Sequence, residues 1–256
     1  NFLGKGISLD TNLQISQESI KGKITYAKPF FNYTDNTLFT SIKSTSEDNL
    51  SNFGYKVNTL GFSIGTKLEQ FENLFFSPEI DFTQEDLETT SKASTNLKKQ
   101  EGSYSDFYFN YGLDYDTRDS SWNPTKGNMF SFYQQLPVVS EEKEISNTFI
   151  FTKYKKLNKQ TNMVGKASVY LKAVNSLDGS DVRVSKRAYI PYYRLRGFKK
   201  GKIGPKDGND FIGGNYVSSL NFSTNLPRLF STMENLDFSY FIDVANVWGV
   251  DYDSTI

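Results

Sequence analysis

Cysteine and histidine are both absent from this chain of 256 residues, and the two absences exclude much of the usual site chemistry. Without cysteine there is no disulfide framework and no thiolate metal site. Without histidine the chain lacks the commonest general base, the usual zinc ligand and the central member of a catalytic triad. We therefore expect no enzyme activity, no bound metal and no cofactor.

An excess of charge of either sign is missing as well, since 29 basic side chains balance 29 acidic ones. A nucleic-acid-binding surface needs an excess of basic groups to displace counterions, so we expect no nucleic-acid partner. Long apolar runs are also lacking. The mean hydropathy is −0.52, and no run of about eighteen apolar residues occurs, so the sequence predicts no transmembrane helix.

What the chain does contain is long alternation of apolar and polar side chains, together with 16% aromatic residues. A period of two predicts β-strands, and about ten residues of one-sided alternation is the length that a tilted strand needs to cross a bilayer. A soluble β-sandwich alternates too, but its apolar face packs on a second sheet. The sequence predicts an all-β protein, a transmembrane antiparallel barrel with a polar lumen. Its clearest apolar face comprises Phe107, Phe109, Tyr111, Leu113 and Tyr115.

The connections between the expected strands alternate in length. Short ones lie near residues 33–36, 70–73 and 158–161, and longer polar ones lie at 85–102 and 175–185. Short turns at one rim and long loops at the other are typical of outer-membrane barrels, so we expect residue 1 at the periplasmic rim. No alternation survives between about Val184 and Gly214. An irregular segment of roughly thirty residues inside a regular barrel is usually functional or disordered, and its aromatic residues argue against disorder.

Four motifs follow one another along the chain. The irregular segment contains Leu195-Arg196-Gly197-Phe198, then Gly204-Pro205, then Gly213-Gly214. The stretch from Phe241 to Trp248 has an acidic residue at Asp243. The others are the opening Leu3-Gly4-Lys5-Gly6 and a turn with Arg118, Asp119, Pro124 and Gly127. In their order along the chain, from the opening to Trp248, the four motifs resemble the BamA-type outer-membrane-protein assembly family of the BamA–TamA (surface-antigen) superfamily.

The resemblance implies a long loop folded into the lumen, whose arginine is held by inward acidic groups of neighbouring strands. Carried over, Arg196 pairs with Asp243, which alternation places on the polar face. Asn221 stands where the family usually has Glu, so this second anchor is expected to be a hydrogen bond. From the residues alone, Arg196 is more readily interpreted as a solvent-exposed charge in a loop, because most arginine side chains lie at the protein surface.

The opening glycines allow two interpretations as well. Glycine weakens a strand, so Leu3, Gly4 and Gly6 could belong to a frayed first strand. The resemblance implies instead a lateral seam, where client strands add to an unpaired edge. The turn residues are expected to be structural, with Pro124 and Gly127 fixing a periplasmic turn through their dihedral angles.

The function implied by the resemblance is assembly: folding and inserting other β-barrel proteins into the outer membrane of a Gram-negative cell. The implied partners are unfolded barrel proteins, assembly lipoproteins and outer-membrane lipid. Residues 1–256 are expected to form part of one barrel, about thirteen strands of roughly sixteen, with POTRA repeats upstream and the last strands downstream. Alternatives are a TamA-like or two-partner-secretion transporter, which shares the loop, and a diffusion porin, which should lack it. A barrel fused to a lipase-like module is a third.

Overall fold

The structure, a computed structural model, describes residues 6–158, 160, 162–226 and 238–253. Eleven strands form one antiparallel sheet, in which each strand pairs with the next along the chain except that β9 is followed by β12. The strands are β1 (Ser8–Ile15), β2 (Ser19–Lys28), β3 (Thr37–Asn49), β4 (Tyr55–Phe71), β5 (Leu74–Thr89), β6 (Gly102–Asp116), β7 (Gly127–Val139), β8 (Glu144–Asn158), β9 (Met163–Ser176), β12 (Tyr216–Leu226) and β13 (Phe238–Trp248).

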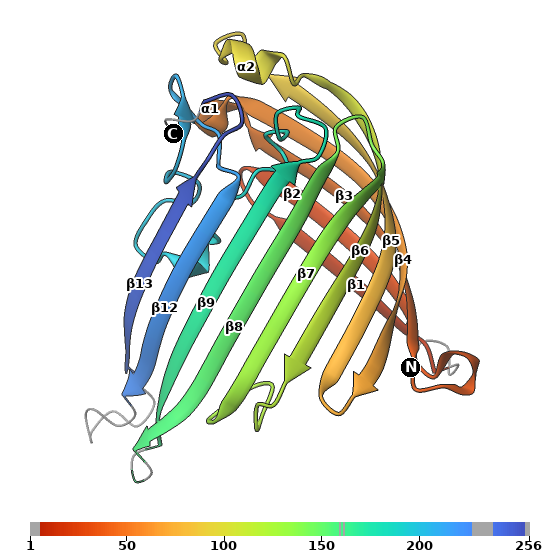
Figure 1. Cartoon of the computed structure of the whole chain (residues 1–256), viewed down its shortest axis with the longest axis vertical. Helices are drawn as coiled ribbons and strands as arrows, with labels where there is room; N and C mark the ends of the chain where they lie inside the picture. The colour runs from red at the N-terminus through yellow and green to blue at the C-terminus, as the bar shows by residue number, and fades with distance from the viewer. Residues whose placement is uncertain (1–5, 159, 161, 227–237, 254–256) are drawn as a thin grey trace.

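Two further strands, β10 (Lys206–Asp207) and β11 (Asp210–Phe211), form a small ribbon between β9 and β12. The helical segments are single turns: α1 (Leu50–Phe53), α2 (Thr95–Lys98), η1 (Phe31–Tyr33) and η2 (Tyr192–Arg194). Among the described residues, no helix is long and apolar enough to cross a membrane. Figure 1 shows the long strands tilted and curved around an interior, with α1 and α2 at one end and the short turns at the other. The expected all-β antiparallel barrel fold is confirmed. Its sheet has eleven strands within the described residues, where about thirteen were expected, because the segment between β9 and β12 supplies only the separate β10–β11 ribbon.

The two faces of the sheet have opposite polarity, and the apolar face is the exposed one. The register aligns Ile24, Ile42, Phe62 and Phe82 in one row across β2 to β5, and these side chains are 45% to 55% exposed. On the other face Asp81 is only 4% exposed and accepts a 2.8 Å hydrogen bond from Lys43. Apolar groups outside and polar groups inside are the pattern of a barrel in lipid, whereas a soluble sandwich has the reverse.

The end of the sheet that carries α1 and α2 is closed by apolar packing between loops. Phe53 of α1, Leu97 of α2 and Val184 of the β9–β12 connection are all buried in one cluster, together with Ile212 and Val250. Three connections far apart in sequence therefore share one core. This packing fixes where the β9–β12 segment enters the interior of the sheet.

Candidate functional site in the lumen

The connection between β9 and β12, residues 177–215, turns toward the polar interior of the sheet (Figure 1). Ala188 and Ile190 of this lumen loop are buried against Tyr170 of β9, Val217 of β12 and Val247 of β13. Ala188 and Gly214 form an antiparallel bridge, with backbone N–H···O distances of 2.7 and 3.0 Å. The loop is thus held by apolar contacts and by its own backbone before any charged group is considered.

Arg196 binds the β13 carboxylate of Asp243 through both arms of its guanidinium. Its Nε donates to Oδ2 and its Nη2 donates to Oδ1, each at 2.7 Å, and the backbone N–H of Arg196 also donates to Oδ2 at 3.1 Å. The guanidinium lies 3.7 Å from the ring centroid of Phe241. The side chain of Asp243 is 3% exposed and that of Arg196 is 37% exposed. Bidentate pairing on an aromatic face is a geometry that lysine could not reproduce.

Asn221 of β12 lies directly opposite Asp243 in the sheet. Its amide Nδ2 donates to Asp243 Oδ1 at 2.9 Å and to the carbonyl oxygen of Arg194 at 2.7 Å. A glutamate here could donate neither bond, because an ionised carboxylate only accepts. The asparagine therefore connects the strand carboxylate to the loop backbone, and it does so as a hydrogen-bond donor.

The glycines that flank the motif let the loop return close to β13. Gly204 has a φ of +113°, and a Cβ there would lie 2.8 Å from Cβ of Val247. A Cβ on Gly214 would lie 2.6 Å from the carbonyl oxygen of Trp248. Pro205 accepts a 3.2 Å backbone bond from Ile212. Gly197 and Gly213 of the same loop also have positive φ, at +87° and +69°.

Residues 1–256 match the Omp85 superfamily domain. The chain belongs to the Omp85 superfamily. It is similar in fold to BamA from Haemophilus ducreyi lacking POTRA domains 1–3, with a TM-score of 0.85 and 24% identity over 97% of this chain and 53% of that one. A SAM50-like protein of Schizosaccharomyces pombe is 27% identical over 143 residues, 54% of this chain and 30% of that protein.

This Omp85 barrel therefore spans about half of the solved relative and less than a third of the curated one. It is a β-barrel membrane protein of the superfamily that occurs in bacterial and mitochondrial outer membranes. Within the described residues, no three carboxylate side chains gather in a way that could hold a metal ion.

Arg194 is a second loop arginine that sequence reasoning missed. It is 7% exposed, and its Nη1 donates to Ser168 Oγ at 3.3 Å and to Asn221 Oδ1 at 3.4 Å. Its guanidinium also lies 4.6 Å from the ring centroid of Tyr170. Ser168, Asn221 and Asp243 form one inward row across β9, β12 and β13, and both loop arginines lie on this row.

Arg183, also missed, is the most buried basic side chain among the described residues and lies toward the closed end of the lumen. Its side chain is 0% exposed; Nη1 is 3.2 Å from Glu85 Oε1 and 3.2 Å from Asp106 Oδ2, and Nε is 3.1 Å from Glu142 Oε2. The guanidinium stacks 3.7 Å from the ring centroid of Tyr104. We name Arg183, Glu85, Asp106 and Glu142 the Arg183 cluster; its carboxylates come from β5, β6 and the β7–β8 connection.

The electrostatics of the Arg183 cluster follow from its burial. Burial alone would lower the pKa of Arg183, but the carboxylates of Glu85 and Asp106 outweigh it and raise that pKa above the usual value. Burial raises the pKa of Glu142, against the opposing effect of Arg183. Lys186 lies 3.5 Å from Glu85 and 3.6 Å from Asp106 as a second cation. Val182 and Val184 on either side of Arg183 are buried as well, but this burial is a feature of the structure that no sequence pattern indicated.

The β6–β7 turn is organised by its two acidic residues. Arg118 donates from Nε and Nη2 to the carboxylate of Asp116, at 2.9 and 2.7 Å. Asp119 accepts from the backbone N–H and the hydroxyl of Thr125, and these hydrogen bonds lower the pKa of Asp119 to about 2. Pro124 lies within this turn, immediately before Thr125.

Gly127 closes the same turn, and we expect its replacement by alanine to be costly. Its φ is +106°, and a Cβ would lie 2.3 Å from the carbonyl oxygen of Thr117. In the full-length protein, Gly127→Ala should lower the free energy of unfolding by about 1–3 kcal/mol, measured by urea titration in detergent. Gly179→Ala is the matched control, because Gly179 also has a positive φ but no atom within 4 Å of its Cβ. Equal losses of stability in the two variants would show that the positive φ, and not the contact with Thr117, causes the effect.

The first-strand prediction lies partly outside the described residues, since Leu3 and Gly4 belong to the undescribed range 1–5. Gly6 is described; it has a φ of +68° and precedes β1. Within the described residues, β1 pairs with β2 on one side only and β13 pairs with β12 on one side only. These are the two edges of the sheet.

Proposed function

We propose that this Omp85 barrel folds and inserts other β-barrel proteins into an outer membrane. The observation that carries the proposal is the lumen loop, anchored by the bidentate Arg196–Asp243 pair. A diffusion porin needs an open lumen, whereas here residues 188–214 pack on the inward faces of β9, β12 and β13. The packed loop stays in the lumen, which suits a barrel that acts through its strands and not as an open channel.

The proposed mechanism involves no covalent chemistry. An edge strand presents a row of backbone N–H and C=O groups, and an extended client segment can add to it as a further strand. We place the client-accepting seam at the first strand of the chain and the residues that lead into it, Leu3, Gly4 and Gly6, because glycine disfavours strand pairing. The anchored loop would keep the polar interior rigid while the wall opens.

The proposed location is the outer membrane of a Gram-negative cell. The support for this location is the resemblance of the four motifs, from Leu3 to Trp248, to the bacterial assembly family. The proposed partners are unfolded barrel proteins, assembly lipoproteins and outer-membrane lipid. We further propose that residues 1–256 are one part of a larger barrel that carries POTRA repeats upstream and further strands downstream.

Depletion of the full-length protein tests this function. Other outer-membrane barrels should lose their folded form together, measured by heat-modifiability on gels. A dedicated transporter, of the TamA-like or two-partner-secretion kind, would instead leave those barrels folded while one exported protein is lost. Such a result would contradict the assembly role. The same assay tests the seam: a disulfide that locks the first strand to its neighbour in the closed barrel should block assembly, and continued activity would place the seam on other strands.

A further inference from the structure

The outward face of β8 changes from aromatic to cationic toward the end with the short turns. Phe149 and Phe151 are followed on the same face by Lys153 and Lys155, since alternate residues of a strand share a face. The register continues this face across three more strands. Lys153 aligns with Ala167 of β9, and Lys155 aligns with Gly165. The two lysines therefore stand beside the two smallest side chains of the neighbouring strand.

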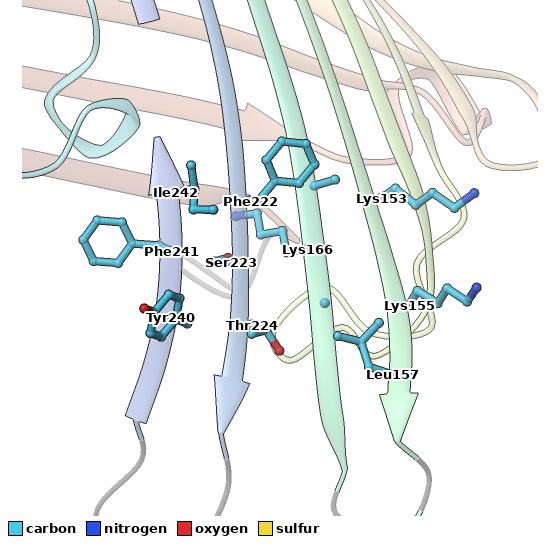
Figure 2. A pocket seen from close by; sticks show the side chains of 12 residues that line it. Lys153, Lys155, Leu157, Lys166, Phe222, Ser223, Thr224, Tyr240, Phe241 and Ile242 are labelled. Atoms are coloured by element: carbon cyan, nitrogen blue, oxygen red, sulfur yellow. The ribbon is translucent and has the colours of Figure 1, made fainter. Parts of the chain in front are cut away.

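Beyond those small residues, the face becomes bulky and apolar again. Ala167 aligns with Phe222 of β12, which aligns with Ile242 of β13. Gly165 aligns with Thr224, which aligns with Tyr240. The result is a groove of about 420 Å³, lined on one side by Leu157 and the stems of Lys153 and Lys155, on the other by Phe222, Ile242 and Tyr240, and between them, as its floor, by Ala167 and Gly165. Figure 2 shows the two ammonium groups at the outer edge of the groove, pointing away from Phe222 and Ile242.

Among the described residues, no acidic side chain forms an ion pair with the two lysines of this groove. Within the described part of the chain, neither Lys153 nor Lys155 is within 4 Å of a carboxylate, whereas the inward Lys43 is paired with Asp81. A lysine on the lipid-facing side of a barrel is costly at mid-membrane and tolerated near the interface, where its long stem reaches the headgroups. Lys153 and Lys155 are therefore expected to lie near the membrane–water interface, beside the apolar wall of the groove.

We propose that this groove binds an anionic phospholipid, with the phosphate held by Lys153 and Lys155 and an acyl chain lying on Ala167 and Gly165 between the wall residues. Two ammonium groups that have no acidic partner among the described residues are complementary to a phosphate, and each can donate three hydrogen bonds. The apolar wall matches a hydrocarbon chain. The end of the barrel with short turns then carries a lipid site on β8, β9, β12 and β13.

Lys28 provides a control residue for the two groove lysines. It is exposed at the corresponding end of β2, on the same outward face as Ile24 and Tyr26, and its Nζ lies 5.9 Å from the ring centroid of Phe31. It is a single cation without a second lysine two residues away. Lys28→Gln therefore removes an outward charge at the same rim without touching the groove.

The test is lipid retention by the full-length protein, measured by native mass spectrometry after exchange with phosphatidylglycerol or phosphatidylethanolamine carrying the same acyl chains. Phosphatidylglycerol should be retained preferentially. Each of Lys153→Gln and Lys155→Gln should weaken its binding about fivefold and the double variant about 25-fold, since a lysine near an anionic lipid contributes about that much attraction. Lys28→Gln should change nothing.

Ala167→Leu fills the floor and keeps both lysines, so it should also weaken retention. Heat-modifiability of each variant checks that the barrel remains folded. Equal retention of the two lipids, or unchanged retention in the double variant, would overturn the proposal. Displacement of the lipid by soluble glycerol phosphate at millimolar concentration would overturn it too, because the site would then hold a phosphate only.

Discussion

Arg183→Met in the full-length protein is expected to lower the free energy of unfolding by about 3–5 kcal/mol, the largest loss that we predict for a single substitution. Methionine fills a similar length but carries no charge. Glu85 and Asp106, which are 3% and 0% exposed, would lose their main cation while Lys186 remains more distant. Removing one partner of a buried ion cluster leaves charge without compensation, and that cost exceeds the value of the contacts themselves.

Urea titration in detergent measures this loss, and two variants control it. Arg183→Lys keeps the charge but loses the planar fork and the stacking on Tyr104, so it should cost less. Lys21→Met breaks the half-exposed pair with Glu47 and should cost at most about 1 kcal/mol, as surface pairs do. If Arg183→Met costs no more than Lys21→Met, the Arg183 cluster does not stabilise the fold.

Arg196→Ala is expected to release the lumen loop and to reduce assembly of other barrels. The substitution removes two charge-assisted hydrogen bonds and leaves the buried carboxylate of Asp243 with the amide of Asn221 and the loop backbone N–H as its remaining donors. We expect a loss of about 2–4 kcal/mol in stability and faster proteolysis within residues 188–214. Arg196→Lys should recover only part of it, because a single ammonium cannot make the bidentate contact.

A double-mutant cycle with Asp243→Asn separates the pair from its surroundings. If the two groups act through each other, Arg196→Ala should cost much less in the Asp243→Asn background than in the native one. Melting temperature, loop proteolysis and the folded fraction of client barrels are measured in parallel. If Arg196→Ala changes neither the melting temperature nor the proteolysis of the loop, Arg196 does not anchor the loop. If only the folding of client barrels is unchanged, the anchor is not needed for assembly.

The alternation of side chains was sufficient to predict much of this architecture. Because side chains alternate between the two faces of a strand, the sequence predicted Asp243 on the same face as Phe241 and on the other face from Ile242. The structure has this arrangement. The short connections near 70–73 and 158–161 were likewise visible as polar breaks between apolar runs. These features are local, because the face on which a residue lies depends only on its parity within one strand.

The pairing of Arg196 with Asp243 was predicted from the family resemblance and not from side-chain alternation. Nothing in the composition or spacing selects one carboxylate for a loop arginine, and a solvated charge was the commoner expectation for an isolated residue. The resemblance of the motifs supplied the pair. The resemblance also gave Asn221 as a second, hydrogen-bonding anchor. In the structure Asn221 donates to Asp243 and to the carbonyl oxygen of Arg194, and the bond to Arg194 was not predicted.

The Arg183 cluster and the lipid groove lay beyond the sequence for a common reason. Arg183 contacts Glu85 and Asp106 across 98 and 77 residues, and Lys153 shares its groove with Ile242 through the registers of three strand pairs. Register between strands is set by turn geometry and by packing over the whole sheet. The sequence by itself determined the strands, their two faces and the irregular loop, because these follow from local periodicity. Only the tertiary structure decided which buried charges meet and where cations border an apolar groove, because those depend on distances between strands that no single segment encodes.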